Sequence, residues 1–141
     1  MQNSFYREII NDHNLHPAHK HALDGAPIEL RGVNPSCGDD ITLRLRVENG
    51  VITEGAYTGD GCAISQASAD MMLDLVIGKT EAEARRLTDI FMRMIKEKVT
   101  DEELDELEEA GALIDVSHMP ARVKCAVLGW RTLDNALEKS R

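Results

Sequence analysis

Alternating apolar and polar residues in the first half of the chain predict a small antiparallel β-sheet. Apolar side chains take every second position of one segment, at Ile41, Leu43, Leu45 and Val47. This pattern is typical of a strand with one buried face. The Asn49-Gly50 pair that follows is a strong hairpin signal, so a return strand is expected over residues 51–57. A strict two-residue loop would put Glu54 opposite Leu45 on the apolar face, so we expect a β-bulge or a sheet edge there.

Helical periodicity dominates the remaining chain. We expect a short helix over residues 4–12 and a longer apolar helix over residues 63–77 that stops at Gly78. One side of the short helix is formed by Phe5, Ile9 and Ile10. A further amphipathic helix is indicated by an i, i+3, i+4, i+7, i+8 stripe of Leu87, Ile90, Phe91, Met94 and Ile95.

Helix-start signals divide the second half of the chain. Capping-box patterns pair a threonine with a glutamate three residues later, at Thr80 with Glu83 and at Thr100 with Glu103. The second pattern precedes a short, very acidic helix that should close at Gly111. Pro120 suits the first turn of the last helix, whose buried face is expected to hold Val123, Val127, Trp130, Leu133 and Leu137. The predicted fold class is α+β, with about three antiparallel strands packed against several helices.

The composition indicates one acidic domain spanning residues 1–141. A chain of this length with 43% hydrophobic residues can bury a real core. Its net charge of −9 argues against nucleic acid or an anionic membrane as partner, because phosphate binding requires clustered Lys and Arg. No apolar run reaches membrane-spanning length, and the first residues do not have the pattern of a signal peptide. We therefore expect a cytoplasmic protein with reduced thiols.

Three cysteines and one aspartate are the candidate metal ligands. Cys37 and Asp39 are two positions apart and could bind the same cation, and Cys62 and Cys125 could complete a shell of three sulfurs and one oxygen. Zinc accepts such a tetrahedral set, and soft thiolate sites also select Cu(I) or an iron–sulfur cluster. The alternative is that all three cysteines are buried, inert apolar side chains. Their odd number leaves no complete disulfide framework.

The local context of each cysteine favours thiolate chemistry. Cys37 follows Asn-Pro-Ser and precedes Gly-Asp, so we expect it on a turn between strands. Cys62 follows Gly-Asp-Gly at a helix start, where the helix dipole favours an anion. Cys125 lies about one turn inside the last helix, where the nearby cations Lys124 and Arg122 also favour thiolate.

Two carboxylates compete for the role of oxygen ligand. We favour Asp39 over Asp40, because in an extended turn its side chain can point to the same side as Cys37. Turn capping or simple solvation is the alternative for both. Three thiolates and a carboxylate would give a zinc site a net charge of −2. Arg122, one turn before Cys125, is placed to offset that charge, and a solvent-exposed arginine is the alternative.

The histidines form the other conspicuous group. Four of them cluster near the N-terminus, at His13, His16, His19 and His21. Histidine is a common metal ligand, but these four lie across a helix end and a proline-broken loop, so we interpret them as polar surface. His118 lies seven residues before Cys125 and could approach the site, although a polar loop residue is the simpler interpretation.

At these positions the chain closely resembles the U-type iron–sulfur cluster assembly family, and within it the SufU branch. The matching segments are Phe5-Tyr6-Arg7-Glu8-Ile9-Ile10-x-Asp12-His13, Asn34-Pro35-Ser36-Cys37-Gly38-Asp39, Gly59-Asp60-Gly61-Cys62-Ala63-Ile64-Ser65 and Arg122-x-Lys124-Cys125. The resemblance implies a fold like that of the SufE and NifU proteins. It also implies that Cys37, Asp39, Cys62 and Cys125 bind zinc, and that a pyridoxal-phosphate-dependent cysteine desulfurase of the SufS type is the partner.

Three features separate the chain from the IscU-type scaffolds of this family. Those proteins have a histidine immediately before the third cysteine, where this chain has Lys124. They also have a shorter connection between the second and third cysteines, whereas Cys62 and Cys125 are 63 positions apart here. The Leu-Pro-Pro-Val-Lys motif that engages a dedicated chaperone is not intact in residues 119–124. These departures put chaperone-assisted cluster transfer in doubt.

The resemblance leads to three functional hypotheses. The leading one is a zinc-dependent sulfurtransferase: a desulfurase histidine displaces Cys37 from zinc, and the freed thiolate accepts the persulfide sulfur for a downstream Suf scaffold. The second is a scaffold that builds a [2Fe–2S] cluster on the same cysteines and donates it to other proteins. The third is an interaction module in which the metal is purely structural.

Overall fold

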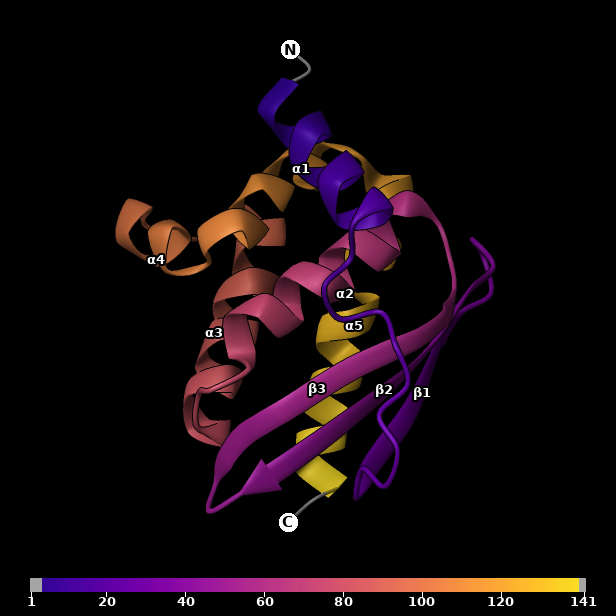
Figure 1. Ribbon diagram of the computed structural model, residues 1–141. Coiled ribbons are helices and arrows are strands. Elements are labelled where there is room, and N and C mark those ends of the chain that lie inside the picture. The colour runs from indigo at the N-terminus through magenta and orange to yellow at the C-terminus, as the bar shows by residue number, and fades with distance from the viewer. Residues whose placement is uncertain (1–3, 140–141) are drawn as a thin grey trace.

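A three-stranded antiparallel sheet organises the molecule (Figure 1). This computed structural model describes residues 4–139, and it describes side chains from Tyr6 onward. The strands lie in the order β1 (Ile28–Asn34), β2 (Asp39–Glu48) and β3 (Val51–Asp60). In β2 the apolar residues Ile41, Leu43 and Leu45 are buried and alternate with half-buried polar residues, as the spacing predicted, whereas Val47 is half-buried. The three-stranded count is confirmed, although periodicity located only β2 and β3.

The hairpin between β2 and β3 contains the expected turn and bulge. Asn49 and Gly50 have φ angles of 53° and 77°, the left-handed pair that a two-residue hairpin turn requires. A register shift between Arg46 and Val47 then sets Glu54 opposite Arg46 instead of Leu45. The Glu54 carboxylate accepts a hydrogen bond from Arg46 Nε at 2.5 Å. The bulge therefore keeps a charged side chain off the apolar face.

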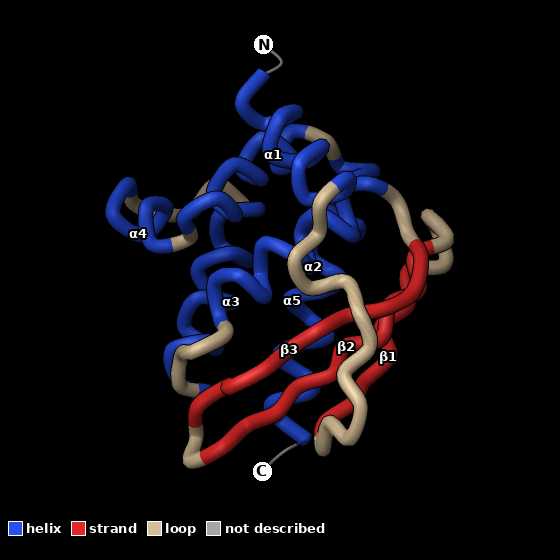
Figure 2. Tube along the Cα trace, in the orientation of Figure 1, coloured by secondary structure: helices blue, strands red, loops and turns tan. Residues whose placement is uncertain are grey.

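Within residues 4–139, five α-helices and one 3₁₀ helix lie on one side of the sheet (Figures 1 and 2). The elements are α1 (Ser4–Leu15), α2 (Ala63–Val76), α3 (Glu81–Ile95), α4 (Asp101–Glu106), the 3₁₀ helix η1 (Glu108–His118) and α5 (Pro120–Lys139). Helix α5 packs against β1 and β2, and α2 lies against α5, α1 and β3. The predicted α+β class is confirmed. None of the helices within residues 4–139 has the length and apolar character needed to cross a membrane.

The helix between Thr100 and Gly111 differs from the prediction. The capping box is present, because the Thr100 side chain accepts from the Glu103 backbone while the Glu103 carboxylate accepts from the Thr100 N–H. However, α4 ends at Glu106 and the chain continues as 3₁₀ turns. The buried apolar side chains of this stretch recur every third position, at Leu107, Ala110, Leu113 and Val116. A period of three matches the three residues per turn of a 3₁₀ helix.

The helical core follows the predicted stripes. The α3 stripe is fully buried, and its Phe91 ring stacks on Trp130 of α5 with centroids 4.3 Å apart. Trp130 Nε1 donates to Ser68 Oγ of α2 at 3.1 Å, so the indole has a polar partner inside the core. Helix α1 is one turn longer than expected and buries Ile9 and Ile10, whereas the side chain of Phe5 lies outside the described residues. The Trp130 contacts join α5, and with it Cys125, to α3 and α2.

Candidate metal centre

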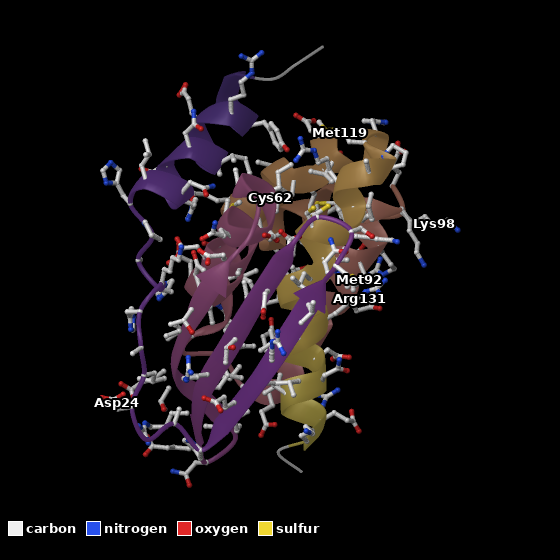
Figure 3. All side chains as sticks on the ribbon, turned by 90° about the vertical axis from the view of Figure 1, so that its right-hand side faces the viewer. Asp24, Cys62, Met92, Lys98, Met119 and Arg131 are labelled. Carbon is white, nitrogen blue, oxygen red and sulfur yellow. The ribbon has the colours of Figure 1, made fainter. Side chains whose placement is uncertain are left out.

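Four separate elements bring the candidate ligands to one end of the sheet. Cys37 lies in the β1–β2 turn and Asp39 is the first residue of β2. Cys62 is the N-cap residue of α2, and Cys125 lies in the second turn of α5. Figure 3 shows Cys62 at this end of the sheet. Ligand atoms of Cys37, Asp39 and Cys125 all lie within 4.8 Å of one another, and the Cys62 thiol, outside this set, interacts with the Cys125 thiol. We call these four residues the cysteine–aspartate cluster.

The β1–β2 turn sets the position of Cys37. The Cys37 N–H donates to the Asn34 carbonyl at 3.2 Å, and the Gly38 N–H donates to the Pro35 carbonyl at 3.3 Å. Gly38 has a φ of +71°, a left-handed value that glycine adopts without strain. The chain can therefore reverse at once into β2, with Asp39 paired opposite Asn34. Cys37 is left exposed at the tip of a tight turn, as its sequence context predicted.

Asp39 is held by three neutral donors. Its Oδ1 accepts from the Cys62 N–H at 2.8 Å and from Ser65 Oγ at 3.1 Å, and its Oδ2 accepts from Asn34 Nδ2 at 3.2 Å. The carboxylate is fully buried. A Cβ on Gly61 would lie 2.8 Å from Asp39 Oδ1, so the glycine before Cys62 lets the helix start approach this carboxylate. The described residues supply Asp39 with no lysine or arginine partner, which leaves its charge unbalanced.

Asp40 faces away from the cluster. It is half-buried and forms a two-bonded ion pair with Arg31, whose Nε and Nη2 donate at 2.8 and 2.6 Å. The hydrogen bond from the Arg31 guanidinium lowers the pKa of the Asp40 carboxyl below its ordinary value. Successive residues of a strand point to opposite faces, which explains why Asp39 rather than Asp40 lies beside the cysteines.

The three sulfurs differ strongly in exposure. Cys37 is exposed, Cys62 is half-buried and Cys125 is fully buried, yet the Cys37 and Cys125 Sγ atoms are only 3.2 Å apart. Burial, followed by hydrogen bonds with Cys37 and Cys62, raises the pKa of the Cys125 thiol. The expectation that Lys124 and Arg122 favour thiolate at Cys125 is not met, because both cations are exposed while Cys125 lies in the core.

The donor set fits a soft or borderline divalent cation. Sulfurs and one carboxylate converge with no cationic side chain of the described residues bonded to them. A bound cation would balance Asp39 and would bind the thiolate form of Cys125 that burial otherwise disfavours. Zinc accepts three sulfurs and one oxygen, and iron–sulfur clusters use the same thiolates.

Arg122 and His118 lie outside this convergence. Arg122 is exposed and its guanidinium makes no hydrogen bond or ion pair within residues 4–139. It is close to Tyr6, whose pKa is raised mainly by burial and next by Asp115, while the Arg122 charge lowers it. Offsetting of the cluster's charge by Arg122 stays a prediction. His118 is exposed at the end of η1 and approaches Glu97 at 3.8 Å, so it is a surface residue as interpreted.

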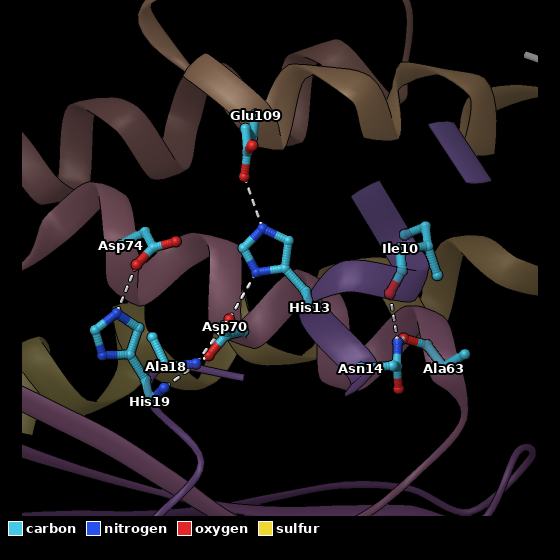
Figure 4. Close-up of polar contacts among 9 residues, drawn as sticks. All are labelled: Ile10, His13, Asn14, Ala18, His19, Ala63, Asp70, Asp74 and Glu109. Atoms are coloured by element: carbon cyan, nitrogen blue, oxygen red, sulfur yellow. Dashed lines mark hydrogen bonds and ion pairs between the residues drawn. The ribbon is translucent and has the colours of Figure 1, made fainter. Parts of the chain in front are cut away.

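A second polar cluster was missed from the sequence. His13 is buried, so its interpretation as polar surface is wrong. Its Nδ1 lies 2.6 Å from Asp70 Oδ2 and its Nε2 lies 2.7 Å from Glu109 Oε1 (Figure 4). The hydrogen bond to Asp70, opposed by burial and helped by Glu109, raises the pKa of His13 to about 9. We call these three residues the His13 network. The sequence signal for this network was Asp70, which lies inside the apolar helix predicted over residues 63–77, because a buried carboxylate requires a partner.

Comparison with known proteins places this geometry in a family. Residues 5–141 match the family described as the NifU-like N terminal domain. The chain is 40% identical over 139 residues to the iron-sulfur cluster assembly scaffold protein IscU of Streptococcus pyogenes, covering 98% of this chain and 86% of that protein. It is 36% identical over 137 residues to the zinc-dependent sulfurtransferase SufU of Bacillus subtilis, covering 96% and 91%.

A solved structure agrees with the sequence match. The SufU structure from Fervidobacterium islandicum superimposes with a TM-score of 0.88 at 35% identity, covering 97% of this chain and 99% of that one. The match extends over all the elements that carry the cysteine–aspartate cluster. This chain therefore belongs to the NifU-like N-terminal domain family, the family of the IscU and SufU iron–sulfur cluster assembly proteins.

Proposed function

We propose that this protein is a zinc-dependent sulfur acceptor in iron–sulfur cluster biogenesis. It takes sulfur from a SufS-type cysteine desulfurase and passes it to a downstream Suf cluster-assembly scaffold. The observation that carries the proposal is the exposed Cys37 thiol 3.2 Å from the buried Cys125 thiol, beside a buried carboxylate. The name of the Bacillus subtilis relative, a zinc-dependent sulfurtransferase, supports the same activity.

The four residues divide into holding and reacting groups. Cys125 and Asp39 are buried and fixed by the core and by hydrogen bonds, and Cys62 is fixed as a helix N-cap. Cys37 alone is exposed, on a turn of a few residues. Zinc would supply a redox-silent charge that stabilises thiolates and tolerates ligand exchange. The proposal therefore assigns metal binding to all four residues and sulfur transfer to Cys37.

The transfer step requires only thiolate chemistry. The Cys37 thiolate attacks the terminal sulfur of a persulfide on the desulfurase cysteine. A bond forms between Cys37 Sγ and that sulfur, the donor's S–S bond breaks, and the desulfurase cysteine leaves as a thiolate. Cys37 is then the persulfide, with no net oxidation. Arg122 is proposed to assist by placing positive charge at the hollow that Tyr6 and Met119 also line.

Desulfurase turnover with a matched pair of variants tests the assignment. The zinc-loaded wild-type protein should stimulate alanine release by a SufS-type desulfurase, whereas the metal-stripped protein and Cys37→Ser should not. Asp40→Asn is the control, because Asp40 points away from the cluster. Mass spectrometry of the wild type should find one additional sulfur on the peptide that contains Cys37. Full stimulation by Cys37→Ser would contradict the proposal.

A second candidate function uses the same ligands. The Streptococcus pyogenes relative is named a scaffold, and three thiolates with a carboxylate can also hold a [2Fe–2S] cluster. Metal analysis of protein isolated without oxygen separates the two. One tight, colourless zinc per chain supports sulfur transfer, whereas stoichiometric iron and sulfide with visible absorption supports the scaffold.

A further inference from the structure

The two edge strands of the sheet differ in whether other segments cover their backbone groups. The outer edge of β3 is covered by other segments: the Tyr57 N–H donates to the His19 carbonyl at 2.9 Å, and the Ile52 N–H donates to the Lys79 carbonyl at 2.9 Å. Within residues 4–139, β1 pairs only with β2. An edge strand offers a row of free N–H and C=O groups to an added strand. The β1 edge is therefore the open end of the sheet.

A groove runs between this edge and α5. It has a volume of about 460 Å³ and is lined by residues 30–34 together with residues of α5. Alternate residues of a strand point to opposite faces, so five consecutive lining residues mean that the backbone edge itself borders the groove. Val33, at its rim, is 46% exposed, which is unusual among the large apolar side chains of this chain.

The groove is basic in an acidic protein. The chain has a net charge of −9, yet Lys124 and Arg131 of α5 line the groove and form no ion pair with any described residue. Figure 3 turns the β1 side of the molecule toward the viewer and labels Arg131 on it. Arg31 also lines the groove, with its charge shared with Asp40. A second hollow shares Leu30 and Arg31 and extends the groove to Lys139 and to Glu138, whose carboxylate pairs with Arg85.

One end of the groove meets the cysteine–aspartate cluster. Asn34, the last residue of β1, lines the groove, and its Nδ2 donates to Asp39 Oδ2 at 3.2 Å and lies 3.9 Å from Cys125 Sγ. Lys124 lines the same end and directly precedes Cys125. An occupant of the groove would therefore contact residues that support the candidate ligands.

We propose that this groove binds an extended, acidic segment of a partner protein, which adds to β1 as a fourth strand. Backbone hydrogen bonds to β1 supply affinity, and alternate side chains meet different surroundings. Acidic residues on one face of the segment lie against Lys124 and Arg131, and apolar residues on the other face cover Val33. A segment of about six residues matches the length of β1. The inference does not depend on which metal the cluster holds.

A labelled peptide of alternating Glu and Val, about six residues long and blocked at both ends, tests the proposal on the zinc-loaded full-length protein. We expect saturable binding by fluorescence anisotropy, with NMR shift changes at the amides of residues 28–34 and not at those of β3. Lys124→Glu with Arg131→Glu should weaken binding by about tenfold or more, because both reverse a charge in the groove. Lys96→Glu with Lys98→Glu, on the α3–α4 connection, reverses the same number of charges and is the matched control, which should bind within about twofold of wild type.

Two further peptides separate strand addition from simple charge attraction. N-methylation of alternate residues removes donors on one edge, so the methylated peptide should lose binding at unchanged charge. A peptide with Lys in place of Glu should not bind. Equal binding of the methylated or the basic peptide would overturn the proposal. So would self-association of the protein that Lys124→Glu with Arg131→Glu abolishes in sedimentation, since the occupant would then be a second copy.

Discussion

Two clusters of potential metal ligands form among residues 4–139, and they balance their charges in opposite ways. Ligand atoms of Cys37, Asp39 and Cys125 in the cysteine–aspartate cluster lie within 4.8 Å of one another, and so do those of a second set made by His13, Asp74 and Glu109. In the second set, His13 already bonds both of its ring nitrogens to carboxylates of Asp70 and Glu109. In the first, neutral groups alone bond to Asp39.

The difference shows that converging ligands are not enough to define a metal centre. A protonated imidazole between two carboxylates is a complete ion-pair network, and the raised His13 pKa of about 9 means that it keeps its proton at neutral pH. A metal would have to displace that proton and break both bonds. The cysteine–aspartate cluster has the opposite need, because a cation would neutralise a buried carboxylate and permit thiolate formation. The proposed metal centre is therefore the one without an internal cation.

The largest expected effect comes from removing a buried ligand. Cys125→Ala should weaken zinc binding by more than about 100-fold, beyond the loss usual for a supporting partner, because a direct sulfur ligand disappears. Competition with a zinc indicator measures the affinity. Asp74→Asn is the control from the second set and should keep one tight zinc per chain. Tight zinc binding by Cys125→Ala, or loss of tight zinc binding in Asp74→Asn, would contradict the assignment of the metal centre to the cysteine–aspartate cluster.

Removing the cation of the His13 network should destabilise the fold. His13→Gln leaves the buried Asp70 carboxylate with only the backbone N–H groups of Ala18 and His19. Breaking a buried ion pair in this way costs roughly 3 kcal/mol of unfolding free energy, measured by denaturant titration. His19→Gln removes a more exposed ion pair with Asp74 and should cost about 1 kcal/mol or less. Equal losses in the two variants would show that the network is not buried in solution.

The His13 network also predicts a pH dependence. The folded pKa of His13 is about 9, above the ordinary value of 6.5. A raised folded pKa stabilises the protein fully below pH 6.5, and that stabilisation is lost as pH rises through 9. The loss is on the order of 3 kcal/mol at most, from the linkage between pKa shift and stability. Unfolding free energies between pH 6 and pH 10 should therefore fall more steeply for wild type than for His13→Gln. Parallel curves would contradict the assignment.

Local sequence signals predicted the parts of the candidate site that depend on local geometry. The turn residues around Cys37 and the strand alternation from Asp39 both act within a few positions, and the structure has both features. The His13 network could not be found this way, because its partners lie 57 and 96 positions away from His13. Whether such a histidine is buried depends on how α1 docks on α2 and η1, which no local pattern specifies.

The structure gives a physical reason why the sequence patterns did not locate β1 and η1. Strand β1 was not located because Gly32 interrupts its apolar alternation. A Cβ at Gly32 would lie 2.1 Å from Thr132 Oγ1, so the glycine is needed for the close approach of α5. The start of η1 was assigned to the acidic helix that should close at Gly111, because charged residues dominate it, while the apolar residues at every third position carried the 3₁₀ signal.

The smallest effect on zinc affinity is expected at Asp40, and comparing this residue with its neighbour Asp39 tests the charge argument within one strand. Asp39 and Asp40 are neighbours, yet Asp39 is buried among neutral donors and Asp40 forms an exposed ion pair with Arg31. Asp40→Asn should change zinc affinity by less than about twofold, because exposed ion pairs are screened by solvent. Asp39→Asn should weaken zinc binding clearly, since it removes the negative charge of the candidate oxygen ligand while leaving an oxygen that can accept from Cys62 and Ser65. If Asp40→Asn lost zinc while Asp39→Asn kept it, the oxygen ligand would be Asp40, and burial among neutral donors would not be the property that selects a ligand here.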